Sequence, residues 1–196
     1  MRDTTLFYTI TGLSPATKIA NKGQPPTPTS PSCTYLEDGH AQEYIMLGSS
    51  KKKAITLFFG PGEFVVQCHS RFSHVESLDN AVAYDYDYSG IFRMLRDHDE
   101  SKEYYRHFQR IYLEKVAARI RSLTQLSAPE RFEELLRLQP WVFELAEEED
   151  IASYLRISSA ILREMKKWFA AIKTQGRRLM RGAESQFYTP EKQSAC

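Results

Sequence analysis

Twenty residues near the C-terminal end decide the fold: Glu148-Glu-Asp-Ile-Ala-Ser-Tyr-Leu-Arg-Ile-Ser-Ser-Ala-Ile-Leu-Arg-Glu-Met-Lys-Lys167. Two short helices that cross steeply need a small residue where they approach, apolar residues around it and a tight turn between them. Ala152 supplies the small residue, and Ser158 is a good N-cap for a second helix after the turn. The residues expected to face inward are Ile151, Leu155, Ile157, Ile161, Leu162 and Met165. The pattern predicts a helix-turn-helix whose second helix spans 158–168.

The residue at the turn departs from the usual motif. Such turns place a glycine where the chain takes a positive φ, whereas this chain has Arg156. Keeping the geometry with an arginine costs on the order of 1 kcal/mol. An ordinary helical hairpin is therefore the alternative interpretation of the same residues.

The formal net charge of +1 hides two segments of opposite sign. Residues 130–150 carry eight acids and two arginines, whereas residues 156–182 carry eight lysines and arginines and one acid, Glu164. A basic segment of this kind attracts polyanions such as DNA because it releases counterions. The alternative is a solvated helix face followed by a basic tail. The residues expected to contact DNA are Ser158, Ser159, Ala160, Arg163, Lys166 and Lys167.

Upstream of the acidic segment, residues 99–126 contain no Gly or Pro. Apolar residues recur there every three or four positions, which predicts an amphipathic helix of about 26 residues, roughly 39 Å long. The stripe consists of Tyr105, Phe108, Tyr112, Val116, Ile120 and Leu123. The same helix of a second subunit would cover it in a homodimer, and packing on the chain's own β-domain is the alternative. Ser127-Ala-Pro-Glu130 then begins a shorter helix that extends to Leu138.

The N-terminal half contains short apolar or alternating runs separated by turn residues. The expected strands lie within residues 43–47, 54–59 and 64–66, and two more lie within residues 75–88, on either side of Asp79-Asn80. Their spacing of about ten residues is typical of a β-sandwich or roll. A run rich in Pro, Ser and Thr from Gly23 to Pro31 is expected to be a surface loop. In the alternation Tyr84-Asp-Tyr-Asp-Tyr88, half-buried tyrosines with outward aspartates explain the pattern better than a metal site does.

Composition limits the remaining possibilities. A chain of 196 residues, 42% of them hydrophobic, builds one or two soluble domains. No stretch has the roughly 18 to 20 uncharged apolar residues that a membrane helix requires. Three widely spaced cysteines, Cys33, Cys68 and Cys196, fit a reducing cytoplasm better than a disulfide framework or a zinc ribbon. The sequence contains no nucleophile turn and no complete zinc-helix motif, so we expect no enzymatic activity, no cofactor and no bound metal.

The order of these motifs resembles the Crp/Fnr family of bacterial transcription regulators, to which the cyclic-AMP receptor protein belongs. The resemblance is closest to short members whose helix-turn-helix lacks a marked C-terminal wing, and it covers about residues 43–168. Besides the long helix, the segments that carry it are Phe58-Phe-Gly-Pro-Gly-Glu-Phe64, Val75-Glu-Ser-Leu78, Leu126-Ser-Ala-Pro-Glu-Arg-Phe132 and Asp150-Ile-Ala-Ser-Tyr-Leu155.

The resemblance implies an α+β fold with four parts. They are an N-terminal β-roll of the cyclic-nucleotide-binding type (1–98), a long dimerisation helix (99–126), a helix-turn-helix domain (127–172) and a basic tail (173–196). The implied function is that of a cytoplasmic transcription regulator that binds DNA as a homodimer and does not bind a membrane. A small-molecule effector of unknown identity, or none, would act on the roll.

Family members that bind a cyclic nucleotide have a second Gly-Glu pair soon after the first turn, and an Arg-Ser or Arg-Thr pair that neutralises the phosphate. This chain keeps the first turn with Gly62 and Glu63. Gln67 replaces the second glutamate, and Phe72 follows Arg71 in place of Ser or Thr. The resemblance thus implies a ligand site with residues missing, in which cyclic AMP binding has been lost.

The expected recognition helix departs from the family as well. Family members carry Arg and Glu early in this helix and another Arg one turn later, because arginine pairs bidentately with guanine. The matching positions here are Ser159, Ala160 and Glu164. The remaining basic residues favour affinity for the DNA backbone over sharp sequence reading. The alternative function is a ligand- or protein-interaction module that keeps the architecture and does not bind DNA.

Overall fold

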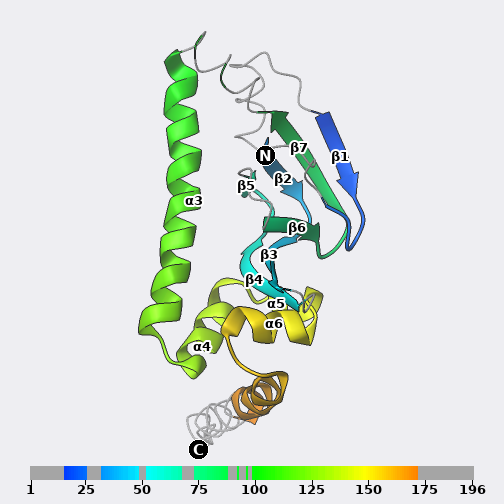
Figure 1. Ribbon diagram of the computed structural model, residues 1–196, viewed down its shortest axis with the longest axis vertical. Helices are drawn as coiled ribbons and strands as arrows, with labels where there is room; N and C mark the ends of the chain where they lie inside the picture. The colour runs from blue at the N-terminus through cyan, green and yellow to red at the C-terminus, as the bar shows by residue number, and fades with distance from the viewer. Residues whose placement is uncertain are drawn as a thin grey trace, which may run out of the picture.

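The computed structural model describes residues 16–25, 32–48, 52–67, 73–87, 92, 96 and 99–171. Two antiparallel sheets form the N-terminal part, and helices follow (Figure 1). The first sheet has the strand order β1 (Ala16–Ala20), β7 (Ala81–Asp87), β2 (Ser32–Asp38) and β5 (Phe64–Gln67). The second has the order β4 (Lys52–Phe59), β3 (Ala41–Leu47) and β6 (Ser73–Ser77). The antiparallel sheets with separate helices agree with the α+β class.

The expected strands are present, and the structure adds two more. β1 and β2 lie in a part of the sequence that has no periodic pattern. β1 pairs along its whole length with β7, from Ala16 opposite Asp85 to Ala20 opposite Ala81. Pairing with a distant strand therefore sets the conformation of β1, which local patterning does not reveal. Most of the expected Pro-rich surface loop lies outside the described residues, and residues 23–25 are exposed.

A β-bulge in β4 makes this strand contribute to two cores. Opposite β3, Leu57 pairs with Glu43 and Ile55 pairs with Tyr44, so Thr56 is the extra residue. An extra residue shifts the alternation of faces by one position. Leu57 accordingly packs between the sheets, whereas Ile55 packs with the C-terminal helices.

The long helix α3 (Asp99–Gln125) runs along one side of the roll (Figure 1). Tyr112 and Val116 pack against the core between the sheets, and Tyr105 and Phe108 pack against a second cluster on the first sheet. These residues belong to the expected apolar stripe, so this part of the stripe packs on the chain's own β-domain. Ile120, from the same stripe, is 56% exposed.

Three short helices and a further helical segment follow α3. They are α4 (Ala128–Leu138), α5 (Val142–Leu145), α6 (Glu148–Leu155) and residues 159–171. α4 begins as predicted, and the Glu130 carboxylate accepts a 2.7 Å hydrogen bond from the Ser127 backbone N–H. Among the described residues, none of the helices has the length and apolar character needed to cross a bilayer.

The helices share one apolar core with the second sheet. Ile55, Phe58 and Leu78 of the β-part are buried together with residues from α4 onward. The helical members of this cluster are Phe132, Leu135, Val142, Ile151, Ala152, Leu155 and Leu162. The core therefore extends across residue 127, where the helix-turn-helix domain is expected to begin.

Hydrogen bonds reinforce this contact along the edge strand β4. The Ser153 hydroxyl on α6 accepts from the Ile55 N–H and donates to the Lys53 carbonyl oxygen, both at 3.1 Å. The Gln42 side-chain amide, which is buried on β3, donates to the Asp150 carboxylate at 2.6 Å. α6 thus covers the edge strand β4 and supplies hydrogen-bond partners to backbone groups of this strand.

Candidate nucleic-acid interface

The turn after α6 is built on a left-handed residue. Arg156 has φ 55° and ψ 47°, and in the described part of the chain no other non-glycine residue has a positive φ. Its N–H donates to the Ser153 carbonyl oxygen at 3.2 Å, and the Ile157 N–H donates to the Ala152 carbonyl oxygen at 3.0 Å. Bonds of this kind close the C-terminal end of a helix. The geometry that usually requires glycine is therefore kept with arginine.

Ser158 caps the helix that begins after this turn. Its Oγ accepts a hydrogen bond from the Ile161 N–H at 3.3 Å, and its carbonyl oxygen accepts one from the Leu162 N–H at 3.0 Å. The side chain thereby satisfies a first-turn backbone donor that has no partner within the helix. The helical segment runs over residues 159–171 and starts where the sequence predicts it.

Most of the residues predicted to face inward are buried or half-buried in the shared core. They are Ile151, Leu155, Ile157, Leu162 and Met165, and Ala152, the small residue at the predicted helix crossing, is buried with them. Ile161 was also predicted to face inward, and this was wrong, because it is 50% exposed. Successive helical residues advance by about 100°, so Ile161 and the buried Leu162 point in different directions.

Three of the residues predicted to contact DNA lie on the solvent side of helix 159–171. Ala160, Arg163 and Lys167 are exposed, whereas Ser159 and Lys166 are half-buried. Lys166 Nζ lies 5.9 Å from the centroid of the Phe143 ring, in a cation–π contact with α5. The structure therefore brings these side chains together along one edge of the helix, next to the Ser158 cap.

Acids accompany two of the basic residues on this edge. Arg163 Nε lies 3.1 Å from Glu148 Oε1, and Lys167 Nζ lies 2.8 Å from Glu164 Oε1. Arg163 is 62% exposed, and exposed pairs of this kind contribute about 0–1 kcal/mol. The acids therefore lower the positive potential of the edge without fixing the cations in place. Glu164 stands out in the sequence as the one acid of the basic segment, whereas Glu148 lies on another helix and is not apparent there.

The other edge of helix 159–171 is apolar, which sequence analysis did not predict. Ile161 and Trp168 are 50% and 57% exposed and border a depression of about 500 Å³. Its other lining residues are Pro129, Ala160, Glu164, Met165 and Phe169. The solvent side of the helix thus combines a basic edge and an apolar edge.

The β4–β5 turn holds two of the predicted ligand residues. Gly62 has φ +85°, a conformation that favours glycine. The Glu63 carboxylate accepts hydrogen bonds from the Gly60 N–H at 2.7 Å and from Lys115 Nζ at 2.6 Å. Burial lowers the pKa of Lys115, and the Glu63 charge opposes this shift. The Glu63 carboxylate therefore takes part in a contact between the roll and α3.

The other predicted ligand residues are less completely described. Gln67 ends β5 opposite Ser32 of β2, and Arg71 lies outside the described residues. The predicted ligand set therefore stays a prediction. In the described ranges, no group of three or more His, Cys, Asp or Glu side chains is placed to hold a metal ion.

A buried arginine that sequence analysis missed joins α3 to α6. Arg119 is 7% exposed, its Cζ lies 3.6 Å from the centroid of the Tyr154 ring, and its Nη2 donates to the Tyr154 carbonyl oxygen. Within the described part of the chain, its Nε and Nη1 are buried without a hydrogen-bond partner. Unpaired buried donors cost about 1–3 kcal/mol. Its spacing of three residues from Val116 is a signal that could have placed it on the side of the helix facing the roll.

No family model and no curated protein matches the sequence. Solved structures match the fold. FixK2 from Bradyrhizobium japonicum has a TM-score of 0.67 at 16% identity, over 84% of this chain and 87% of FixK2. A protein from Eubacterium rectale assigned to the Crp/Fnr family of transcriptional regulators has a TM-score of 0.63 at 13% identity, over 86% of this chain and 84% of that protein.

A third match is the c-di-GMP-responsive global regulator CLP from Xanthomonas campestris. Its TM-score is 0.58 at 14% identity, over 86% of this chain and 92% of CLP. Each match covers both the sheets and the helices, so the similarity extends over the whole fold. At such identities they establish the fold. The chain therefore has the fold of the Crp/Fnr-type transcription regulators, as the order of its sequence motifs led us to expect.

Proposed function

We propose that the protein is a DNA-binding transcription regulator in which α6 and residues 159–171 form the helix-turn-helix. The observation that carries the proposal is the closed turn at Arg156, followed by a capped helix with Arg163 and Lys167 on its solvent side. A recognition helix enters the major groove with its N-terminal residues at the base edges. The Crp/Fnr-type fold supports this role, because regulators share it.

The proposed regulator is a homodimer that contacts two DNA half-sites about one helical turn, roughly 34 Å, apart. The second subunit would pack on the face of α3 that the roll leaves uncovered. Leu113 and Ile120 on this face are 62% and 56% exposed. A single helix-turn-helix offers few contacts, so a dimer is needed for useful affinity and for half-site spacing.

The proposed sensor does not use cyclic AMP. In this proposal the Glu63 carboxylate stabilises the β4–β5 turn and the contact with α3, through Gly60 and Lys115. In this role the Glu63 carboxylate is a structural contact and not a ligand of the sensor. The presence of Gln67 and Phe72 in place of the family's residues also argues against cyclic AMP binding. No catalytic step is part of the proposal.

The basic edge suits phosphate contacts better than base reading. Arg163 and Lys167 each lie close to an acid. Ala160 has no polar side-chain group with which to read a base edge. Phosphate contacts position a protein on DNA, and base contacts supply most of the sequence information. We therefore propose moderate, salt-dependent affinity with limited sequence preference.

The test is DNA binding by the full chain, followed by fluorescence anisotropy. The DNA is the region upstream of the protein's own coding sequence, compared with a random duplex of equal length. The double variant Arg163→Ala/Lys167→Ala is expected to bind more weakly, with a slope of log K against log salt lower by about 2, because two phosphate contacts are lost. Glu164→Gln is expected to bind several-fold more tightly, because it removes an acid from the same face.

The matched control is Lys22→Ala/Lys52→Ala, which removes two exposed lysines from the sheet region. This variant should bind DNA as the wild type does. Unchanged affinity in the Arg163/Lys167 variant would mean that this helix does not contact DNA. Equal binding of both duplexes would reduce the proposal to a DNA-binding protein without sequence preference.

The second candidate function is a protein-interaction module that does not bind DNA. The apolar edge of helix 159–171 favours it, because Ile161 and Trp168 expose large apolar surfaces beside a depression. This function predicts that the wild type and the Arg163/Lys167 variant are alike in failing to bind either duplex.

A further inference from the structure

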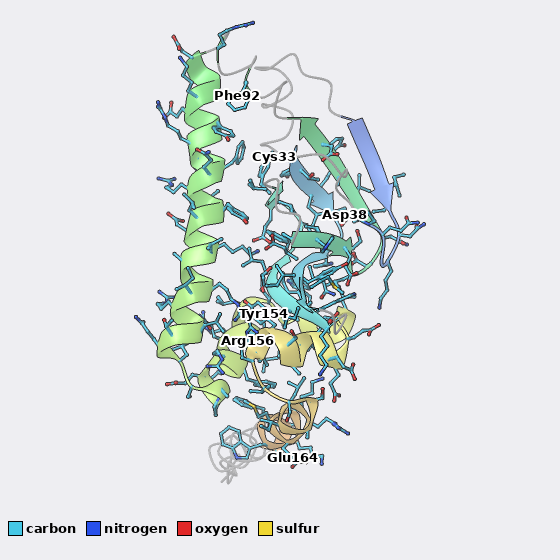
Figure 2. The ribbon with its side chains drawn as sticks, viewed as in Figure 1. Cys33, Asp38, Phe92, Tyr154, Arg156 and Glu164 are labelled. Atoms are coloured by element: carbon cyan, nitrogen blue, oxygen red, sulfur yellow. The ribbon has the colours of Figure 1, made fainter. Side chains whose placement is uncertain are left out.

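A cavity of about 260 Å³ lies where α3, α4, α6 and the β4–β5 turn meet. Tyr154, which borders it, and Arg156, which follows α6, lie beside the lower part of α3 (Figure 2). The charged residues of its lining are Glu63, Lys115, Arg119, Arg121, Arg131 and Glu134. The lining thus carries an excess of two positive charges.

The two carboxylates of the lining are already used by two of its cations. Glu63 is bonded to Lys115 at 2.6 Å, and Glu134 lies 3.8 Å from Arg121. Arg131 donates to the backbone carbonyl oxygens of Leu155 and Leu126. In the part of the chain that the structure describes, Arg119 and Arg131 therefore have no carboxylate partner.

Arg119 is the unusual member of this group. More than nine-tenths of the residue is buried, and its Nε and Nη1 lack hydrogen-bond partners among the described residues. Burial lowers its pKa, and the charges of Arg156 and Arg131 act in the same direction, while the Tyr154 contact and the charge of Glu134 oppose them. A buried cation among other cations, with two unused donors, is an arrangement that an anion would complete.

We propose that this cavity binds a small ligand through a phosphoryl group held by Arg119 and Arg131. The Nε and Nη2 edge of a guanidinium matches two phosphate oxygens bidentately, and Nη2 would exchange the Tyr154 carbonyl oxygen for one of them. A phosphate dianion would also balance the two excess positive charges of the lining. Because Nε and Nη1 have no contact with solvent, binding requires the Arg119 side chain to turn from the Tyr154 ring toward the cavity.

The site shares Glu63 with the predicted ligand residues and is separate from the proposed dimer face. Ile111, Ala118 and Ser122 line the cavity from α3, whereas Leu113 and Ile120 lie on the opposite side of the helix, since successive residues advance by about 100°. A second subunit on the Leu113 face would leave the cavity open. The proposal does not depend on DNA binding, and it is tested without DNA.

The experiment is titration of the full chain with inorganic phosphate at constant ionic strength, followed by calorimetry. The wild type is expected to bind one phosphate per chain saturably. Arg119→Met is expected to weaken binding at least about tenfold, because it removes the bidentate donor edge. Arg137→Met, which removes an exposed arginine of α4 outside the cavity, is the matched control and should bind as the wild type does.

A second variant and a second measurement keep the test independent of folding defects. Arg119→Lys keeps the charge and loses the planar fork, so its affinity should also fall. In a ¹⁵N–¹H spectrum of the arginine side chains, the Nε–H signal absent from Arg119→Met should shift on phosphate addition. Equal phosphate affinity in the wild type and both Arg119 variants would overturn the proposal. Absence of saturable binding to the wild type would overturn it too, and acetate binding as well as phosphate would exclude phosphoryl recognition.

Discussion

Arg156 keeps a backbone conformation that glycine adopts without strain. At φ 55° its Cβ is crowded by its own backbone, yet the hydrogen bonds of the turn are made. The buried contacts of Ile151, Leu155 and Leu162 on either side of the turn hold the two helices in place. Packing of the flanking residues therefore compensates for the local strain at the turn.

We expect Arg156→Gly to be more stable than Arg156→Ala by about 1 kcal/mol in free energy of unfolding. Both variants remove the arginine charge near Arg119, so the comparison isolates the backbone strain. Urea denaturation followed by circular dichroism measures the difference. Equal stability of the two variants would mean that the turn relaxes away from the left-handed conformation.

At the scale of elements, α3 has two different apolar faces. Tyr112 and Val116 pack on the roll, whereas Leu113, Ala117 and Ile120 lie within about 60° of one another on the exposed side. The sequence period predicted a single stripe. Ile120 belongs to this stripe by spacing and lies on the exposed face in the structure. The stripe therefore divides between the chain's own roll and the proposed dimer face.

We expect Leu113→Glu to convert a dimer into a monomer of 22.7 kDa, because it places a charge in the centre of the exposed face. Leu136→Glu changes an exposed leucine on α4 and is the matched control, which should remain dimeric. Sedimentation velocity over a range of protein concentrations measures the mass. A wild type that sediments at 22.7 kDa at every concentration would rule out a dimer through α3.

At the scale of the whole molecule, the helices and the second sheet are joined by one core. Ile55 and Phe58 of β4 are buried together with Leu155 and Leu162. Asp150 adds a polar contact to this interface through Gln42 of β3. The orientation of helix 159–171 relative to the roll therefore depends on both apolar packing and a half-buried carboxylate.

The Asp150 contact predicts a pH dependence. Burial raises the pKa of this carboxyl above 3.8, and the Gln42 hydrogen bond and Lys53 oppose the shift. The folded state thus binds the proton more tightly, so the wild type loses stability as pH rises from about 3.8 through the folded pKa. Asp150→Asn keeps an acceptor for Gln42 and lacks this titration. Its stability relative to the wild type should therefore rise through the same window and then stay constant.

Urea denaturation at a series of pH values measures this difference. Glu149→Gln, an exposed neighbour on α6, controls for the loss of one acid near the helix start. A stability difference between Asp150→Asn and the wild type that does not change with pH would contradict the assignment.

The features predictable from the sequence are those in which neighbouring residues set the conformation. The Ser158 cap, the start of α4 and the period of α3 depend on residues within a few positions of one another, so their signals are local. The order of the motifs also predicted the fold, which the solved structures confirm. β1 and the exposure of Ile161 escaped prediction, because pairing and packing with distant segments decide them.

In the candidate sites, too, the residues of a single segment are visible in the sequence, whereas the contacts between distant segments are not. The basic residues of helix 159–171 are visible in the sequence, and the acid beside Arg163, which comes from another helix, is not. Glu63 and Lys115 are 52 residues apart, and Gln42 and Asp150 are 108 apart, so no local pattern links either pair. The buried donors of Arg119 depend on where three helices and a turn converge. Periodicity and caps are properties of short segments, whereas burial and charge pairing arise only when distant segments pack together.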